Sequence, residues 1–419
     1  MRDSVFQLKC QCNNYPWGKK GSASLAAQLC SKTLSAGFKI DESKNYAEMW
    51  LGTYPELPAR ILSTGEDLQD VLNRYECLIG SSVYEKFGSE LPFLPKVLSI
   101  QKALPLQLHP NRALAEELHK KDPSNFTDPN HKPEIAIALG PFEAFVGFKP
   151  LTTIAQLMEL EPLQQFLPEI KKPRFDDPML KHVVNAILKA SDTTISNVVR
   201  ALEGSREDKF GPDGHYIPKM AKRLRGQYDQ TDPGIVVALV TMNYMQLNAG
   251  DCIYIPADGI HAYLSGDIIE CMARSNNVLN TGFCPAADRN NADLFTDALT
   301  FTVHDTEEAI LKSKDFERCT KGKTKVYSPP LSEFDVLKTE LEKGEEELIS
   351  ALRGPAIAIV TKGTGLMTTK REDYTDPDAD KTPERSFRLQ EGFVFFIGFN
   401  NIIRLETQTS LELFIAFAE

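Results

Sequence analysis

The chain has 419 residues, a formal net charge of −11, and 42% hydrophobic and 25% charged residues. This composition is typical of a folded globular protein, and the length predicts two or three domains rather than one core. The negative charge argues against nucleic acid or an anionic membrane as a partner, although a local basic pocket can still bind a small anion.

Compartment signals agree with an intracellular location. The first residues, MRDSVFQLKCQC, lack the apolar segment of a signal peptide, and no apolar run of about 18 residues occurs in the chain. Eight cysteines are scattered without the spacing of a disulfide framework. We therefore expect a cytoplasmic protein with reduced thiols.

The N-terminal part of the chain alternates between strand and helix patterns. Strands are predicted at 5–11 and 91–100, and helices at 22–35, 68–79 and 83–87. Tyr46 and Trp50 lie beside Gly and Pro turns, which is more typical of a packed corner than of a binding platform.

Polar residues interrupt the next two predicted strands, SIQKALPLQLHP and HKPEIAIAL. Residues two apart on a strand point to the same face, so Gln107 and His109 project together, and Glu134 projects from the second strand. An imidazole, a carboxylate and an amide oxygen on one face suit a borderline cation such as Zn²⁺. His261, just after a later short strand in IPADGIHAY, would complete the set.

Taken alone, each of these residues is weak evidence, because a single histidine on a strand is more often structural. His119 and His131 are competing ligands, and His131 lies in a turn close to Glu134. His182, on a predicted helix, is expected to be a packed or surface residue. The metal prediction therefore depends on the combination of four residues on or beside strands.

Helical and β patterns alternate through the rest of the chain. Apolar residues at three- and four-residue spacing predict amphipathic helices between Leu151 and about Arg225. From Gly234 the pattern predicts short strands joined by Gly, Asp and Asn turns, as in an antiparallel barrel or jelly roll. A further set of strands, which contains no histidine, follows Asp305, and the polar segment 368–386 is predicted to be a hairpin or a disordered loop.

Seven sequence blocks carry a resemblance to a known family. They are YPWG at 15–18, YAEMWLGTYP at 46–55, LPFLPKVLSI at 91–100, QLHPNRALAEELH at 107–119, NHKPEIAIAL at 130–139, GPFEAFVGFKP at 140–150 and HAYLSGDIIECMARSNN at 261–277. In this order they resemble segments of the type I phosphomannose isomerases, zinc enzymes of the cupin fold.

The resemblance implies a mainly β fold with two cupin (jelly-roll) barrels and an inserted α-helical domain. Residues 1–150 with 226–305 would form the metal-binding barrel, 151–225 the helical insertion and 306–419 a second, metal-free barrel. The resemblance also implies one zinc ion per chain, held by the residues at the family's ligand positions. These positions are Gln107, His109, Glu134 and His261.

The family reaction interconverts mannose 6-phosphate and fructose 6-phosphate through a cis-enediol(ate) and supplies GDP-mannose synthesis. It requires a base, positive charge near the reacting oxygens and a site for a phosphorylated sugar. We expect Lys132 to contribute a cation and Glu270 a carboxylate that moves protons. Tyr263 shares a strand face with His261 and could hydrogen-bond the sugar. The alternative for Glu270 is an ion pair with a basic residue on the barrel wall.

Three positions depart from the family pattern. Asn280 and Ala286 stand where the family has an arginine and a lysine, and Pro105 replaces a serine. Losing an arginine from a transition-state contact costs on the order of a thousandfold in rate. Arg274 or Arg289 could substitute from neighbouring positions.

Three hypotheses about function follow. The chain is a zinc-dependent isomerase; or it is a zinc-binding paralogue that acts on another substrate or serves as a binding protein; or its zinc is purely structural. A glutamine ligand argues against the last, because structural zinc sites favour closed Cys and His sets. The sequence leaves the oligomeric state open and is compatible with a monomer.

Overall fold

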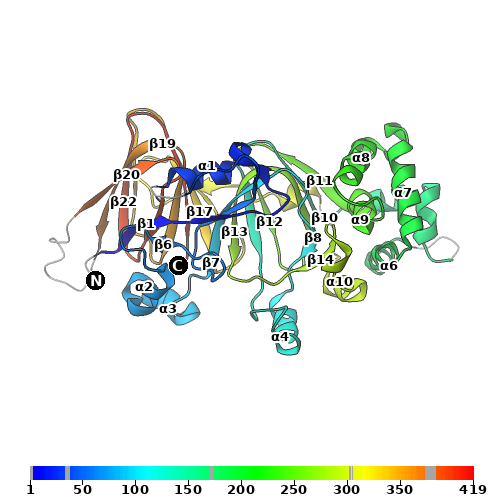
Figure 1. Cartoon of the computed structure of the whole chain (residues 1–419), viewed down its shortest axis with the longest axis horizontal. Helices are drawn as coiled ribbons and strands as arrows, with labels where there is room; N and C mark the ends of the chain where they lie inside the picture. The colour runs from blue at the N-terminus through cyan, green and yellow to red at the C-terminus, as the bar shows by residue number, and fades with distance from the viewer. Residues whose placement is uncertain (1–2, 34–37, 170–173, 302, 304, 373–383) are drawn as a thin grey trace.

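The computed structural model describes residues 3–33, 38–169, 174–301, 303, 305–372 and 384–419. Its strands form two large antiparallel sheets, and a group of helices lies at the far end of the molecule from the chain termini (Figure 1). The expectation of a mainly β protein with a helical insertion is confirmed. All eight cysteines are free. No helix in the described part of the chain is long and apolar enough to cross a membrane.

The first sheet has ten strands and carries the predicted metal ligands; we call it the metal-bearing sheet. Its longest strand, β13, pairs with β7, β8, β9 and β10, so it joins most of the sheet together. The ten strands are β2 (Gln11–Asn13), β5 (Glu48–Trp50), β7 (Phe93–Ile100), β8 (Leu106–Leu108), β9 (Glu134–Ala138), β10 (Phe142–Phe148), β11 (Met242–Leu247), β12 (Cys252–Ile255), β13 (His261–Ala273) and β14 (Leu279–Gly282).

The second sheet has eleven strands and contains the C-terminal part of the chain. Its strands are β1 (Val5–Lys9), β6 (Arg60–Ile61), β15 (Lys314–Asp315), β16 (Thr324–Tyr327), β17 (Asp335–Leu341), β18 (Glu346–Ile349), β19 (Ala356–Arg371), β20 (Arg385–Gln390), β21 (Val394–Ile397), β22 (Asn401–Glu406) and β23 (Leu411–Phe417). The pairing of the described strands leaves both sheets open.

The N-terminal strand crosses between the predicted units. β1 pairs antiparallel with β21, with Leu8 opposite Val394, and β6 pairs with β1. Two strands of the predicted segment 1–150 therefore belong to the second sheet, because their apolar side chains fill the core between the sheets. The other predicted boundaries stay predictions.

Helices of the insertion are α5 (Leu151–Met158), α6 (Asp177–Leu188), α7 (Asp192–Gly204), α8 (Ile217–Gln227) and α9 (Pro233–Thr241). The prediction that β structure begins at Gly234 is wrong, because this segment is the helix α9. Every residue of α9 is buried, so the sequence is apolar on all sides and shows no helical period. Asp232 at the N-cap and Pro233 at the first helical position were the signals of its start.

The other α-helices of the described chain lie outside the insertion. They are α1 (Leu25–Lys32), α2 (Leu68–Arg74), α3 (Ser81–Phe87), α4 (Arg112–Lys121) and α10 (Ala292–Ala298). The helices predicted at 22–35, 68–79 and 83–87 are present, with shorter or shifted bounds. Part of the predicted polar hairpin, 373–383, lies outside the described residues; β19 and β20 pair on either side of it.

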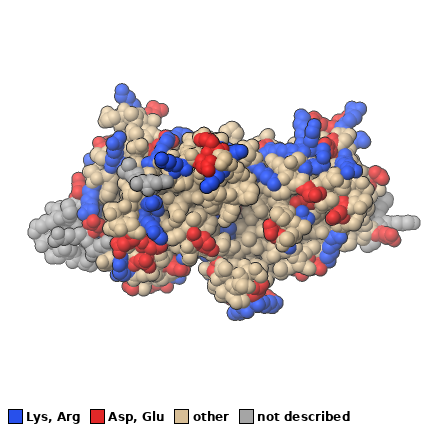
Figure 2. Space-filling view, viewed as in Figure 1, with Lys and Arg blue, Asp and Glu red and all other residues tan. Residues whose placement is uncertain are grey.

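Charges are mixed over the face shown in Figure 2. Lysine and arginine side chains alternate with aspartate and glutamate over both sheets and the helical end, and no broad basic area is seen on this face.

Candidate metal centre and its surroundings

Three strands of the metal-bearing sheet bring the predicted ligands together. Gln107 on β8 lies opposite His261 at the start of β13, and paired residues of antiparallel strands share a face. Glu134 begins β9, between its partners Ile255 and Met272. His109 follows β8 directly. Residues from well-separated parts of the chain thus meet at one place.

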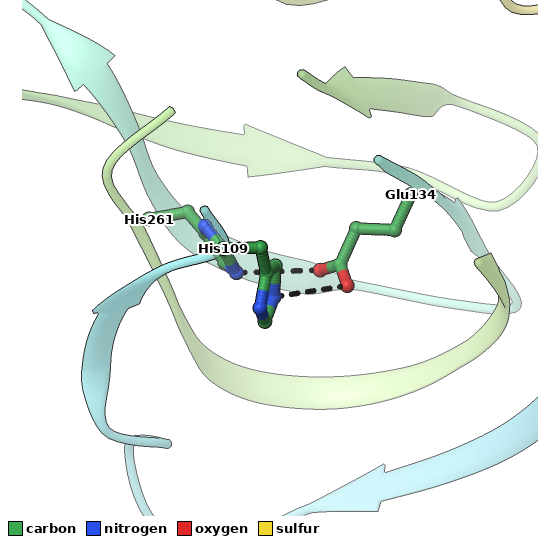
Figure 3. Close-up of side chains that lie close together, drawn as sticks. All are labelled: His109, Glu134 and His261. Carbon is green, nitrogen blue, oxygen red and sulfur yellow. Dashed lines mark ion pairs between the residues drawn. The ribbon is translucent and has the colours of Figure 1, made fainter. Parts of the chain in front are cut away.

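The centre is formed by His109, Glu134 and His261, whose ligand atoms all lie within 4.8 Å of one another. The Nε2 atom of His109 is 3.4 Å from Oε2 of Glu134, and that of His261 is 3.3 Å from Oε1 (Figure 3). Both imidazoles are fully buried and the carboxylate is 2% exposed. Two nitrogens and a carboxylate at this spacing make a site that a divalent cation can occupy.

The backbone fixes both imidazole rings. Nδ1 of His109 lies 2.8 Å from the Asn277 carbonyl oxygen, and Nδ1 of His261 lies 3.0 Å from that of Gly259. A carbonyl only accepts hydrogen bonds, so Nδ1 of each ring carries a proton and Nε2 of each ring faces Glu134. Such support of the second nitrogen is usual for metal-binding histidines.

Charge and hydrogen bonding at the centre also fit a metal. Burial, followed by the nearby Lys132 cation, lowers the pKa of His109 to about 4, so its ring is neutral near pH 7. The Nε2 atom of His109 is buried and has no hydrogen-bond partner in the described structure. Burial acts to raise the pKa of Glu134, but its contacts with the two histidines outweigh burial and hold the pKa well below its usual range. A neutral ring with an unused lone pair beside an ionised carboxylate is the donor set that a cation requires.

Gln107 reaches the same place. Its Nε2 atom lies 3.3 Å from Nε2 of His261. The two ends of a glutamine amide are interchangeable by rotation, and the rotated form would point Oε1 at the centre. This geometry is compatible with the predicted role of Gln107 as a fourth ligand.

The predicted catalytic residues lie on or beside two strands that carry the centre, β9 and β13. The Tyr263 hydroxyl donates a hydrogen bond of 2.7 Å to Glu134. Glu270 lies opposite Ala136 on the face that carries Glu134. Burial lowers the pKa of Lys132, followed by repulsion from Lys96.

Glu270 forms the ion pair that was the alternative interpretation of this residue. Its Oε2 atom lies 3.1 Å from Nζ of Lys96, which is also 3.6 Å from Glu48. Burial raises the pKa of Glu270 to about 7, although Lys96 opposes this. An ion-paired carboxyl that titrates near neutrality can still exchange a proton at physiological pH.

Sequence reasoning missed Lys96, Glu48 and Asn277. Lys96 is the one charged residue in the apolar strand FLPKVLSI, whose residues are all buried, and that isolated charge was the available signal. Trp50 packs with Tyr54 in a small apolar cluster, as the packed-corner interpretation expected, and its indole also donates to Glu48. Nothing in the sequence identified Asn277, which acts through its backbone carbonyl.

Arg274 and Arg289, which were proposed to replace the family arginine missing at position 280, make their contacts outside the metal centre. Arg274 contacts Thr53 and Glu90, each at 3.1 Å. Arg289 contacts Asp232 at 3.0 Å. Neither guanidinium has a contact with the metal centre among the described residues.

The three positions that depart from the family pattern differ in how they are placed relative to the predicted metal ligands. Asn280 lies opposite Gln107 in the β8–β14 pair and so shares its face, and its buried amide oxygen has no hydrogen-bond partner in the described structure. Ala286 begins an exposed short 3-10 helix, and Pro105 is half-buried just before β8.

The competing histidines lie outside the centre. His119 on α4 contacts the Phe126 carbonyl at 2.6 Å. His131 contacts Glu333 at 2.7 Å. His182 on α6 is exposed.

Comparison with known proteins places this geometry in context. Residues 5–151 match a model of the phosphomannose isomerase type I catalytic domain, and residues 325–368 match one of the phosphomannose isomerase type I C-terminal region. The mannose-6-phosphate isomerase of Aspergillus fumigatus is 34% identical, over 99% of this chain and 96% of that protein. That of Saccharomyces cerevisiae is 35% identical, over 100% of both chains.

Solved structures share the fold. A crystal structure of mannose 6-phosphate isomerase bound with zinc and yttrium superposes with a TM-score of 0.80 at 22% identity, over 100% of both chains. A crystal structure of the Salmonella typhimurium mannose 6-phosphate isomerase with fructose 6-phosphate and zinc gives the same TM-score, identity and coverage.

Proposed function

Because the chain belongs to the type I phosphomannose isomerase family, we propose that it interconverts mannose 6-phosphate and fructose 6-phosphate with one bound zinc ion. The observation that carries the proposal is the buried centre of His109, Glu134 and His261, with two imidazole Nε2 atoms aimed at one carboxylate. Gln107 is the proposed fourth ligand. Zinc, when bound, supplies positive charge that favours the negative charge developing on the sugar oxygens.

The chain's own groups carry the proton transfer in this proposal. The reaction moves a proton between the first two carbons of the open sugar through a cis-enediol(ate). Glu270, with a pKa of about 7, is suited to take the proton from one carbon and return it to the next. Lys132 contributes positive charge near the reacting oxygens, and Tyr263 orients Glu134 through its hydrogen bond.

The proposed reaction supplies mannose 6-phosphate for GDP-mannose synthesis. Its substrate is a small phosphorylated sugar. We propose that the protein works in the cytoplasm, as the absence of disulfides among its eight cysteines suggests.

A second candidate function is favoured by Asn280. This residue shares a face with Gln107 and presents an uncharged amide, while Arg274 and Arg289 are both engaged in ion pairs. A centre with fewer cations would bind a phosphate more weakly. The alternative is a zinc-binding paralogue that acts on a different substrate or serves as a binding protein.

A coupled assay of the zinc-loaded protein with mannose 6-phosphate, beside the Asn280→Arg variant, separates these functions. Turnover by the unmodified protein supports the isomerase, and Arg274 and Arg289 would be mutated next. Activity only in Asn280→Arg identifies a diverged paralogue with an intact site. Absence of turnover in both rejects the proposed isomerase.

Zinc content tests the metal assignment independently. Glu134→Ala and His261→Ala each remove a ligand and are expected to lose bound zinc, measured per chain by elemental analysis after dialysis. His182→Ala, on an exposed face of α6, is the control and should keep the metal. Stoichiometric zinc in both site variants would refute the assignment.

A further inference from the structure

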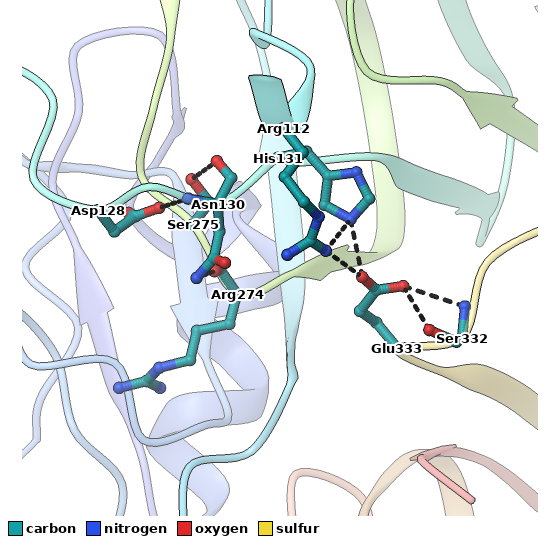
Figure 4. Close-up of polar contacts among 8 residues, drawn as sticks. All are labelled: Arg112, Asp128, Asn130, His131, Arg274, Ser275, Ser332 and Glu333. Carbon is teal, nitrogen blue, oxygen red and sulfur yellow. Dashed lines mark hydrogen bonds and ion pairs between the residues drawn. The ribbon is translucent and has the colours of Figure 1, made fainter. Parts of the chain in front are cut away.

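Glu333, an acidic residue close to the second sheet, contacts the loop that leads to the metal ligand Glu134. Glu333 lies just before β17, and its side chain is buried. Its Oε1 atom is 2.7 Å from Nε2 of His131 and 3.1 Å from Nη2 of Arg112, at the start of α4 (Figure 4). Its Oε2 atom accepts from the Ser332 backbone N–H at 3.0 Å. Both oxygens are therefore engaged.

The partner of Glu333, His131, lies in the loop between α4 and β9, which also carries Lys132 and leads to Glu134. His131 directly precedes Lys132 and lies three residues before Glu134. The loop between α4 and β9 has no regular secondary structure after Asp128, so only its contacts hold it in place.

The other side of this loop is already tied to the metal centre. The Asn277 side-chain amide donates to the carbonyls of Asp128, at 2.7 Å, and Asn130, at 3.0 Å. The backbone carbonyl of the same Asn277 holds Nδ1 of His109. Asn277 therefore holds the loop by hydrogen bonds on one side, and Glu333 holds it through His131 on the other.

Charge makes the Glu333 contact strong. Burial acts to raise the pKa of this carboxyl, but the hydrogen bond and charge of His131 outweigh it, and the pKa lies below its usual range. An ionised, buried carboxylate requires its partners, because leaving it unpaired is costly. Glu333 and its two partners therefore hold one another in place.

A cavity beside the contact gives the loop room to move. It has a volume of about 260 Å³ and is lined by residues that include Arg112, Asn130, His131 and Glu333. If Glu333 were removed, His131 could swing into this space, and Lys132 would follow its neighbour.

We propose that Glu333 is a positioning residue for the metal centre: from the second sheet region it fixes His131, and through His131 it fixes Lys132 and Glu134. The inference rests on the proposed function where it concerns catalysis, and on geometry alone where it concerns the metal. It gives the C-terminal region a part in the site, exerted through His131.

Three variants test the proposal. Glu333→Ala removes the contact, and Glu333→Gln keeps an acceptor oxygen but not the charge. Tyr327→Phe is the matched control, since the Tyr327 hydroxyl makes another contact between the two regions, to the Gly250 carbonyl at 2.8 Å, at a turn that carries no site residue. For each we would measure thermal stability, zinc affinity by chelator competition, the absorption spectrum of Co²⁺ at the site, and kcat and KM.

A positioning role predicts a specific pattern. Glu333→Ala should weaken zinc binding or lower kcat by roughly tenfold and change the Co²⁺ spectrum, as loss of a residue supporting a metal ligand does. Glu333→Gln should recover part of this loss. Tyr327→Phe should lower stability without changing the spectrum or zinc affinity.

The opposite pattern overturns the proposal. If Glu333→Ala lowers stability as Tyr327→Phe does while zinc affinity, the Co²⁺ spectrum and kcat stay unchanged, Glu333 serves docking alone. Absence of mannose 6-phosphate turnover in the unmodified protein would reject the proposed function, but the zinc and Co²⁺ measurements would still decide the role of Glu333.

Discussion

Lys149 shows how burial changes the chemistry of a single residue. Its side chain is almost fully buried after β10, where Nζ donates to the Leu239 carbonyl at 2.7 Å and lies 5.6 Å from the ring centre of Tyr216. Burial lowers its pKa from 10.5 to about 7, and the charge of Asp213 opposes this only in part. At neutral pH the folded protein therefore holds a lysine that is close to losing its charge.

This shift makes stability depend on pH. Between about pH 7 and about pH 9.5 the unfolded chain binds a proton at Lys149 that the folded chain does not. The free energy of unfolding should therefore increase by roughly 3 kcal/mol over this pH range because of Lys149. The Lys149→Met variant has no ionisable group at this position. It should be more stable than the unmodified protein near neutral pH, and the difference in the free energy of unfolding between the two proteins should shrink as the pH rises.

Urea unfolding at the two pH values measures the difference. Lys219→Met, at an exposed lysine, is the control and should show no such trend. A Lys149→Met difference that is the same at both pH values would contradict the shift.

Single residues also show what a sequence can predict about a site. Gln107, His109, Glu134 and His261 were identifiable because strand alternation says which side chains share a face, and the structure does bring them together. Their partners were not identifiable, because Asn277 acts through its backbone, and the Glu333 contact spans 202 residues of chain from His131.

At the level of elements, α9 shows where periodicity fails. A helix buried on all sides has the same composition as a buried strand, so only its first residues distinguished the two. Amphipathic helices such as α6 and α7 were predicted correctly, because one face of each is exposed and the apolar spacing is visible.

Asp232 at the start of α9 is expected to stabilise several elements at once. Its side chain is fully buried, accepts from the N–H groups of Gly234 and Phe283, both at 2.8 Å, and pairs with Arg289. Asp232→Ala should lower the free energy of unfolding by roughly 3–5 kcal/mol, since it removes the cap and leaves Arg289 without its partner.

Urea denaturation at neutral pH checks this value. The control is Asp229→Ala, since Asp229 caps only an exposed turn at Thr231, and it should cost about 1 kcal/mol or less. Equal losses in the two variants would show that the Asp232 contacts contribute nothing beyond a surface cap.

For the whole molecule, the crossing of β1 couples the two sheets. Leu8 is fully buried in β1 and belongs to the apolar core shared by both sheets. Leu8→Ala should lower the free energy of unfolding by roughly 2–5 kcal/mol. Both sheets should lose stability together, because the cavity opens in their common core.

Two probes separate the sheets. The two tryptophans, Trp17 and Trp50, pack against the metal-bearing sheet, so their fluorescence reports on it, whereas circular dichroism reports on the whole chain. Coincident transitions that shift together in Leu8→Ala are expected. A shift in circular dichroism alone would show that the sheets unfold independently; Leu366→Ala, at a partly exposed position, is the control.

The position of β1 also has a consequence during synthesis. Its partner β21 is separated from it by almost the whole chain, so the strand emerges from the ribosome long before β21 exists. At a translation rate of roughly 5–20 residues per second, this delay is on the order of tens of seconds. During that time β1 has only the two-residue strand β6 to pair with, and a nascent-chain chaperone that shields this segment would improve the yield of native protein.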